Sequence, residues 1–288
     1  MPSRSRERHL AKLAERRQAE RIASARRRRT IVLTAIGSVL AIALAVIGIK
    51  TLRGSSSSAS PSSSASGSPS PTSAAGQVTG TVNPNPAPAQ VACGAKAPPS
   101  AGKPKPQFAG PPPMKIDARK TYTAVMKTSC GTISIQLDAK NAPETVNSFV
   151  FLAQHHFFDG QYFTRLDTSI DVVQGGDPTG TGSGGPGYAI PDELNPTPTY
   201  GTATLAMANT GSPNTGGSQF FLITGPKGNG LNASPTYTVF GKIVGGLGVA
   251  QRIQAMPIKD PTAAAGGDIT AQAPAQAIYM DSVTISQK

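Results

Sequence analysis

A cluster of glycines is the first candidate for chemistry in this sequence. Residues 180–185 read GTGSGG, which fits the G-x-G-x-x-G pattern of nucleotide-binding loops. That chemistry requires a helix directly after the glycines, because the N–H groups at its N-terminus bind the phosphates. Pro186, Pro191 and Pro196 exclude such a helix. Residues 180–185 are therefore predicted to be a glycine-rich loop that binds no nucleotide.

No side chain is placed for covalent catalysis. The sequence lacks the G-x-S-x-G motif of serine hydrolases, and His155 and His156 are the only histidines outside the basic N-terminal segment. Both follow a predicted helix, where a surface role or an interaction with the helix C-terminus is expected. Neither cysteine has a histidine at the spacing of a zinc ligand, so no metal and no cofactor are expected. Any chemistry must be non-covalent.

The stretch from Met207 to Phe221 reads MANTGSPNTGGSQFF and leaves two interpretations open. Small polar residues precede Gln219 and two adjacent phenylalanines. The stretch could be a surface loop before a strand, or one wall of a site whose floor is an aromatic ring. Side chains alternate between the two faces of a strand, so Gln219 and Phe221 are predicted to share a face, with Phe220 on the other.

The net charge of +12 is concentrated at the N-terminus. Residues 1–29 contain eleven Lys or Arg and three Glu, which gives +8 of the total. The remainder of the chain is only weakly basic, so its charge is no argument for nucleic-acid binding, and none is expected. Residues 1–29 are predicted to be a basic cytoplasmic segment.

A membrane anchor is predicted next. Residues 30–49 are uncharged and long enough to span a bilayer as a helix. Basic residues precede them, so the N-terminus is expected in the cytoplasm and the C-terminal part outside, as a single-pass protein of the cell membrane. A cleaved signal peptide is the alternative, but the basic segment and the apolar run are both long for one.

A linker rich in Ser, Pro and Ala is predicted over residues 50–118. Twelve of the twenty-three residues in 54–76 are serine, too polar to form a core, and a flexible tether is expected. Cys93 lies in this linker and Cys130 in a predicted turn. On the exported side an even number of cysteines is compatible with one disulfide, which would pin the linker to the domain. Two free thiols are the alternative.

Residues 119–288 are predicted to form the ordered domain. A first helix is expected from Pro143, with apolar residues at helical spacing, and a second over residues 247–255. Many short strands separated by Gly and Pro favour a mainly-β barrel or sandwich with helical caps. The predicted strands cover residues 121–128, 131–139, 161–166, 171–176, 203–209, 218–224, 237–244 and 280–286.

Three segments in order resemble the cyclophilin family of peptidyl-prolyl cis-trans isomerases. They are FTRLDTSIDVVQGGDPTGTGSGGPGY (163–188), LAMANTGSPNTGGSQFF (205–221) and YTVFGKIVGGL (237–247), and the likeness extends from about residue 121 to 288. The resemblance implies an eight-stranded antiparallel β-barrel capped by two α-helices. The basic start, single anchor and Ser/Pro tether resemble membrane-anchored actinobacterial members.

The resemblance also implies the site. Arg165 matches the catalytic arginine and Gln174 the glutamine that orients it. Phe221 matches the floor of the proline pocket, and Ala208, Asn209 and Gln219 match residues of its walls. Val172, Leu231 and Tyr237 are further expected substrate-binding positions. The expected partners are proline-containing polypeptides, and the domain is expected to be a monomer.

Departures from the family pattern concern activity. Thr164 replaces the usual histidine of F-H-R, and one extra residue separates Arg165 from Gln174. The segment Ile170-Asp171-Val172 stands where an aromatic residue and Met are usual. Gly230 aligns with the tryptophan common in eukaryotic members. The primary prediction is a prolyl isomerase that assists folding of exported proteins. The alternatives are a peptide-binding chaperone or scaffold of low activity, and a structural or adhesion head on a stalk.

Overall fold

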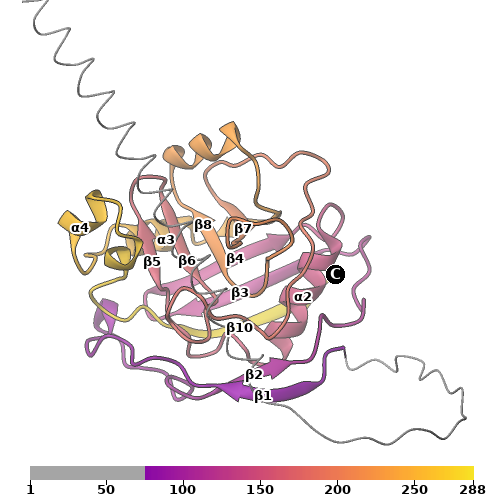
Figure 1. Ribbon diagram of the computed structural model, residues 1–288, viewed down its shortest axis with the longest axis horizontal. Coiled ribbons are helices and arrows are strands. Elements are labelled where there is room, and N and C mark those ends of the chain that lie inside the picture. Colours follow the sequence, from indigo (N-terminus) through magenta and orange to yellow (C-terminus); the bar gives the residue numbers. More distant parts are fainter. Residues whose placement is uncertain (1–74) are drawn as a thin grey trace, which may run out of the picture. The chain divides into compact units, whose positions relative to one another are not determined.

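The structure, a computed structural model, describes residues 75–288 (Figure 1). The predicted basic segment, membrane span and serine-rich tether up to residue 74 lie outside the described residues. Among residues 75–288, no helix combines the length and apolar composition that crossing a membrane requires. Ordered structure in the described chain begins well before Tyr122, near which the sequence predicted the ordered domain to begin.

A curled eight-stranded antiparallel sheet forms the centre of the domain (Figure 1). All eight predicted strands are present, and only their bounds differ from the prediction. Their bounds are β3 (Tyr122–Thr128), β4 (Gly131–Leu137), β5 (Arg165–Asp167), β6 (Val172–Gly175), β7 (Thr204–Met207), β8 (Phe220–Ile223), β9 (Val239–Gly245) and β10 (Met280–Gln287). Neighbouring strands pair in the order β10-β3-β4-β9-β7-β8-β6-β5. An isolated antiparallel bridge between Tyr162 and Tyr279 joins the segments that lead into the two edge strands.

Burial in the β3–β4 hairpin follows the alternation of the sequence. In β3, Tyr122, Ala124 and Met126 are buried, and in β4 so are Ile133 and Ile135. Strand pairing runs without a bulge through this hairpin, whose turn is Ser129 and Cys130. One face of the hairpin therefore contributes to the core, as the period of two predicts.

Two predicted helices are confirmed, and a third was not predicted. Helix α2 spans Pro143–Gln154 and α3 spans Leu247–Gln254. Proline is favourable at the first turn of α2 because its missing N–H would have no helical partner there. The short helix α4 (Pro261–Ala265) and the 3₁₀ helix η3 (Ile269–Gln272) lie in residues 255–279, which we call the C-terminal excursion. Two further 3₁₀ helices are η1 (Ala92–Gly94) and η2 (Pro226–Ala233).

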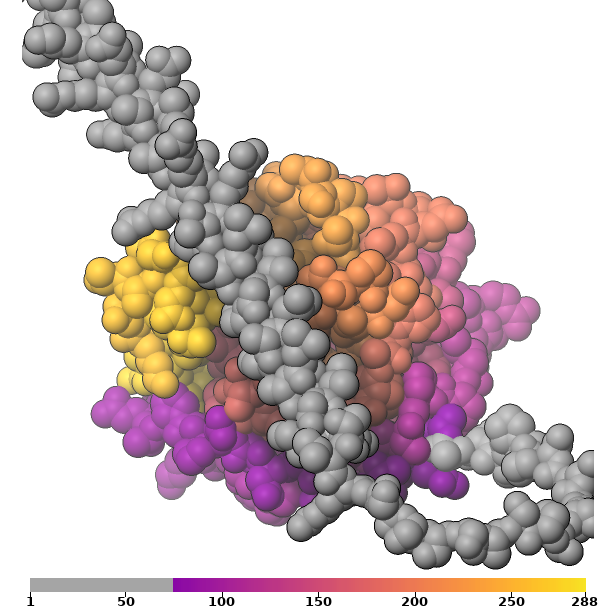
Figure 2. All heavy atoms as spheres, in the orientation of Figure 1, coloured from indigo at the N-terminus to yellow at the C-terminus, as the bar shows by residue number. Residues whose placement is uncertain are grey.

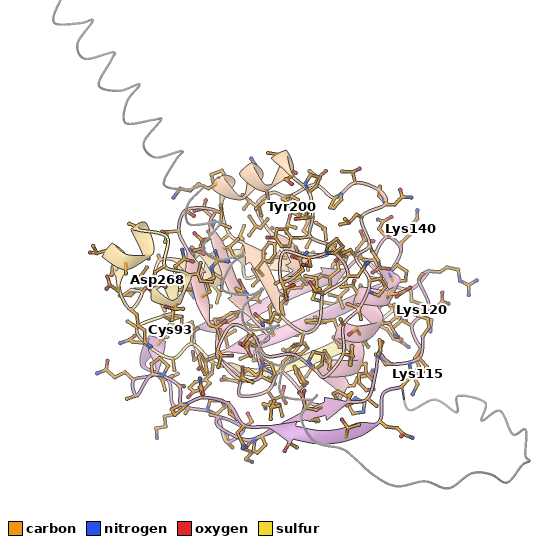
Figure 3. The ribbon with its side chains drawn as sticks, viewed as in Figure 1. Cys93, Lys115, Lys120, Lys140, Tyr200 and Asp268 are labelled. Carbon is orange, nitrogen blue, oxygen red and sulfur yellow. A yellow bond between two sulfur atoms is a disulfide. The ribbon has the colours of Figure 1, made fainter. Side chains whose placement is uncertain are left out.

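Phenylalanines from α2 and the sheet make the centre of the main core. The ring of Phe149 in α2 lies 4.9 Å from that of Phe158 and 5.8 Å from that of Phe220 in β8. All three side chains are almost fully buried. A second, smaller cluster contains the buried Tyr200, which lies inside the domain, whereas Lys140 lies at its periphery (Figure 3).

Residues 75–118, which we call the arm, are ordered. The prediction of a disordered linker up to residue 118 is therefore wrong for this segment. Strands β1 (Val78–Val82) and β2 (Lys105–Phe108) pair as a two-stranded antiparallel ribbon. The arm is ordered because its few apolar side chains have partners in the domain. Phe108 is 1% exposed, and its ring lies 4.9 Å from that of Phe151 in α2.

A disulfide joins the arm to the sheet. Cys93 and Cys130 are bonded, with their Cα atoms 5.3 Å apart and a separation of 37 positions in sequence. Cys130 lies in the β3–β4 turn, so the bond fixes the middle of the arm to one end of the hairpin. Of the two outcomes that the sequence left open for these cysteines, the structure contains the bond.

The arm also contacts the glycine-rich loop, residues 180–185, and its flanks. Backbone N–H groups of Asn85 and Phe108 donate to the carbonyls of Thr179 and Pro186, both at 2.8 Å. The side-chain amide of Gln107 donates to Gly185 O at 2.8 Å. In Figure 2 the violet atoms of the arm lie along the lower side of the domain. The arm therefore supports this loop from outside.

Candidate active site

One cavity of about 680 Å³ brings the predicted site residues together. All nine line it, although they come from β5, β6, β8, η2, the segment after β7 and the segments before β8 and β9. They are Arg165, Val172, Gln174, Ala208, Asn209, Gln219, Phe221, Leu231 and Tyr237. The stretch from Met207 to Phe221 therefore forms a wall of a site, as the second interpretation of it requires.

The apolar floor of the cavity consists of Val172, Phe221, Leu231 and Tyr237. These side chains belong to a small hydrophobic cluster separate from the main core. The rings of Phe221 and Tyr237 meet edge to face, with centroids 5.2 Å apart, an arrangement that aromatic quadrupoles favour. Buried Tyr200 supports the floor from below, because its hydroxyl donates to the carbonyl of Tyr237 at 2.8 Å.

Phe220 and Phe221 have different roles because adjacent strand residues face opposite ways. Phe220 is fully buried among the rings of the main core, whereas Phe221 lines the cavity and is 5% exposed. Gln219 lines the cavity beside Phe221. The predicted division of faces is confirmed, with Phe220 in the core and Phe221 on the cavity side together with Gln219.

The polar wall of the cavity is a chain of three side chains, Arg165, Gln174 and Gln219. Arg165 Nη1 donates to Gln174 Oε1 at 3.2 Å, and Gln174 Nε2 donates to Gln219 Oε1 at 3.0 Å. Arg165 and Gln174 are also direct partners across the β5–β6 pair. The chain places a guanidinium, which is always charged, at the edge of an apolar pocket.

The glycine-rich loop completes the polar wall with its backbone, a role that the sequence did not reveal. Gln219 Nε2 donates to the carbonyls of Gly182 and Gly184, at 3.0 and 2.9 Å. A side chain at position 184 would collide with Asp177 and Thr179. Asp177 is 2% exposed and accepts from Thr179 N at 2.8 Å, which fixes the start of the loop. The absence of a side chain at Gly184 thus permits the close backbone approach to Asp177 and Thr179.

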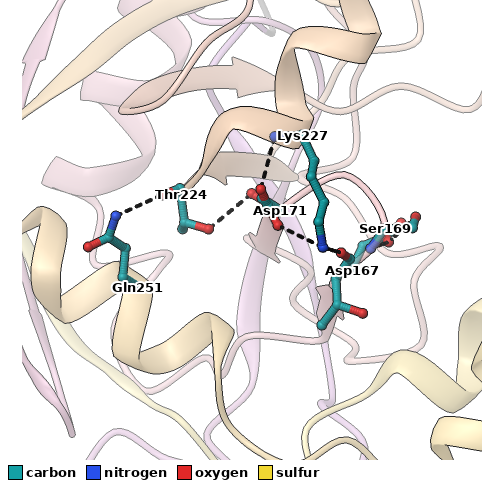
Figure 4. Close-up of polar contacts among 7 residues, drawn as sticks. Asp167, Ser169, Asp171, Thr224, Lys227 and Gln251 are labelled. Carbon is teal, nitrogen blue, oxygen red and sulfur yellow. Dashed lines mark hydrogen bonds and ion pairs between the residues drawn. The ribbon is translucent and has the colours of Figure 1, made fainter.

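The altered segment between Arg165 and Gln174 is firmly held (Figure 4). Asp171 has a left-handed backbone, with φ of 51°, and its carboxylate accepts from Lys227 N at 3.0 Å. Its carbonyl accepts from Thr224 N at 2.8 Å, which ties the start of β6 to the end of β8. Lys227 Nζ donates to Thr168 O at 2.7 Å. The extra residue is therefore accommodated in a loop with defined contacts, and Val172 enters the floor 1% exposed.

Two residues outside the prediction contact Arg165. Its Nε donates to Gln272 Oε1 in η3 at 2.6 Å, and its Nη2 pairs with the carboxylate of Asp167. Gln272 is 107 positions away in sequence, so no spacing rule could have identified it. Asp167 lies two residues along the same strand, where side chains share a face, and this signal could have been noticed.

Comparison with known proteins identifies the family. The family described as "Cyclophilin type peptidyl-prolyl cis-trans isomerase/CLD" matches residues 123–284, which include both predicted helices and all or most of every strand of the eight-stranded sheet. The chain belongs to the cyclophilin family. The isomerase activity predicted from the sequence is the activity for which this family is described.

Relatives and one solved structure agree with this assignment. The probable peptidyl-prolyl cis-trans isomerase A of Mycobacterium bovis is 38% identical over 182 residues, covering 58% of this chain and 93% of the relative. A peptidyl-prolyl cis-trans isomerase of Synechococcus elongatus is 44% identical over 119 residues, covering 41% of this chain and 78% of the relative. A cyclophilin crystal structure from Cryptosporidium parvum is 26% identical, with a TM-score of 0.50, and covers 58% of this chain and 99% of its own.

Two tyrosines beside this cyclophilin site, Tyr188 and Tyr200, are neutral at physiological pH. Burial raises the pKa of Tyr188 to about 12, although its hydroxyl bonds to that of Ser148 at 2.8 Å. Burial also raises the pKa of Tyr200. In residues 75–288, no group of three His, Cys, Asp or Glu side chains is arranged to hold a metal ion. The site offers an apolar floor and charged N–H donors, which suits binding without covalent chemistry.

Proposed function

We propose that the cavity binds the proline ring of an X–Pro segment and that Arg165 accelerates rotation about its peptide bond. Rotation faces a barrier of about 18–20 kcal/mol, because the planar amide must lose its resonance. As it does, the lone pair of the imide nitrogen localises and can accept a hydrogen bond. Catalysis then requires an apolar holder for the ring and a donor for the nitrogen, and no covalent bond to the peptide is made.

The observation that carries this proposal is the meeting of Arg165 and Phe221 in one cavity. An always-charged donor beside an apolar ring favours the twisted state over the planar one. Each 1.4 kcal/mol of stabilisation confined to that state is worth about tenfold in rate. Ala208 and Asn209 extend the cavity along the side where the rest of the peptide would lie.

We further propose that the natural substrates are exported polypeptides. The uncharged run 30–49, preceded by basic residues, supports an anchor that places the domain outside the cytoplasm. The disulfide supports the same compartment, because such bonds persist where the environment is oxidising. The activity there would be to speed X–Pro isomerisation, which is slow enough to limit folding.

A protease-coupled assay of cis/trans exchange on the full-length protein tests the proposed catalysis. We expect saturable acceleration by the wild type and a loss of at least about 100-fold in Arg165→Ala, since removal of one such donor typically costs that much. Binding of a proline peptide, measured separately, should survive in the variant. Equal rates for wild type and Arg165→Ala would refute the catalytic role of the arginine.

The alternative function is a proline-peptide-binding chaperone or scaffold of low activity. One observation favours it: Asp167, which is 4% exposed, pairs with Arg165 and satisfies part of its charge. This alternative predicts peptide binding at the cavity with little acceleration in the wild type. The same assay, read beside the binding measurement, separates the two functions.

A further inference from the structure

The guanidinium of Arg165 is held by three acceptors at once. Nε donates to Gln272 Oε1 at 2.6 Å, Nη1 to Gln174 Oε1 at 3.2 Å, and Nη2 to the carboxylate of Asp167. A guanidinium has five N–H donors in a planar, rigid arrangement. Three are used by these acceptors, which leaves two for a peptide in the cavity.

Two of the three acceptors act from outside the cavity. Arg165 and Gln174 line the cavity, whereas Asp167 and Gln272 do not. Both side chains are buried, with 4% and 9% exposure. The second carboxylate oxygen of Asp167 accepts from the backbone N–H and the hydroxyl of Ser169, at 2.9 and 2.6 Å (Figure 4). The carboxylate is therefore itself fixed in direction.

We propose that Asp167 and Gln272 are positioning residues, which fix the plane of the Arg165 guanidinium so that its remaining N–H groups point at the bound imide. A free arginine side chain explores many rotamers, and fixing it only at the moment of catalysis costs conformational entropy. Acceptors that hold it in advance remove that cost and leave the donor preorganised. This inference rests on the proposed role of Arg165 as the donor.

The C-terminal excursion thereby becomes part of the site. Its helix η3 brings Gln272 to β5, and Lys259, Ile269 and Ala273 from the same excursion line the cavity. Asp268 accepts from Thr270 N at 2.9 Å and caps η3, which fixes the turn that carries Gln272. The excursion therefore supplies both a wall of the cavity and an acceptor behind it.

The first test is Gln272→Ala in the full-length protein. We expect kcat to fall about five- to tenfold with KM within about twofold of wild type, and Gln272→Glu, which keeps an acceptor, to restore most of kcat. Gln254→Ala is the matched control, because Gln254 is equally buried, at 9% exposure, and has no hydrogen-bond partner for its side chain among the described residues. Unchanged kcat in Gln272→Ala would overturn the role of Gln272.

A double-mutant cycle asks whether the effect passes through Arg165. If it does, Gln272→Ala should not slow the residual activity of Arg165→Lys any further, because contacting residues are not additive. An equal loss in both backgrounds would overturn a positioning role. Asp167→Asn, which keeps the size but removes the charge, should lower kcat about threefold, and an increase in kcat would overturn the role of Asp167.

A spectroscopic readout keeps this inference separate from the catalytic proposal. In protein labelled with ¹⁵N-arginine, the Nε–H signal of Arg165, assigned by its absence in Arg165→Lys, should be protected from solvent exchange in wild type. It should shift and lose that protection in Gln272→Ala, but not in Gln254→Ala. If these signal changes occur in a protein without isomerase activity, Gln272 does hold the Arg165 guanidinium and only the proposed function fails. An unprotected Nε–H signal in wild type refutes the proposal that Gln272 fixes the guanidinium.

Discussion

The apolar floor and the polar wall of the cavity differ in what keeps them in place. The floor is the exposed side of a small hydrophobic cluster, in which Phe221 and Tyr237 pack on buried Tyr200. The wall is a chain of directional hydrogen bonds that starts behind Arg165 and ends at the carbonyls of Gly182 and Gly184. Packing is nearly non-directional, whereas hydrogen bonds weaken steeply with angle.

This difference indicates what each side of the cavity can tolerate. A floor made by packing accepts other apolar side chains of similar volume. A wall made by hydrogen bonds requires each partner at its place, and this one has additional acceptors in Asp167 and Gln272. Substitutions in the wall should therefore affect kcat, and substitutions in the floor should affect KM.

Arg165→Lys is expected to have the largest effect. Lysine keeps the charge but cannot reach three separate acceptors and still direct N–H groups at the substrate. We expect kcat/KM to fall about 100-fold or more, mainly through kcat. The measurement is the protease-coupled assay over a range of peptide concentrations, and more than about a tenth of wild-type kcat would show that charge alone suffices.

Phe221→Leu and Phe220→Leu form a matched pair on adjacent residues. For Phe221→Leu we expect KM to rise about tenfold with a small change in kcat, because part of the ring contact with the proline is lost. Phe220→Leu should instead leave KM within about twofold and lower the free energy of unfolding by about 1–2 kcal/mol, since it alters core packing. Denaturant titration and kinetics check both, and similar KM values would contradict the assignment of floor and core.

Gln219→Leu tests the link between the wall and the glycine-rich loop. Loss of its bonds to Gly182 O and Gly184 O, and to Gln174, should lower kcat about three- to fivefold. The control is Gln107→Leu, which removes a bond to Gly185 O from the outer side of the same loop. We expect that variant to stay within about twofold of wild type, and an equal loss would mean that loop order, not the wall, limits the rate.

An effect confined to alkaline pH is expected from Tyr188, which also lines the cavity. Burial raises its pKa from 10.0 to about 12, so the folded state disfavours the phenolate. Its contribution to stability is complete below about pH 10 and is lost as the pH rises toward 12, by at most roughly 2–3 kcal/mol. Tyr188→Phe should therefore lose less stability than wild type in denaturant titrations between pH 9 and 11. Parallel curves would contradict this.

The sheet and both long helices were predictable from sequence because their signals are local. Alternation in β3 and β4 and the helical spacing after Pro143 each lie within about a dozen residues. The arm has no such signal. Phe108 is ordered because its ring packs against those of Phe151 and Tyr188. These partners are 43 and 80 positions away in sequence, and composition does not identify contacts at such separations. Proline and glycine there suggested disorder, but tertiary contacts outweigh that tendency.

The site was predictable only as far as a family motif extends. Arg165, Gln174 and Phe221 lie in matching segments, and the cavity brings them together. Gln272 belongs to the C-terminal excursion, which has no matching motif. The loop groups that bind Gln219 are backbone carbonyls, and the identity of a side chain does not reveal the direction of its backbone carbonyl. The sequence therefore did not reveal the side chains that hold Arg165 from outside the cavity, nor the backbone groups that complete its polar wall.

The disulfide also has a mechanical consequence. A pull on the chain from its N-terminal side first meets β1, which can unzip from β2, and then Cys93. Beyond that point the covalent bond passes the load directly to Cys130 in the β3–β4 turn. Residues 94–129, including β2 and all of β3, lie outside this path and bear no tension. Only residues 75–92 can be peeled away, which releases roughly 60 Å of chain at full extension. The bond from Asn85 to Thr179 is then lost, but Gln107 and Phe108 keep their bonds to Gly185 and Pro186.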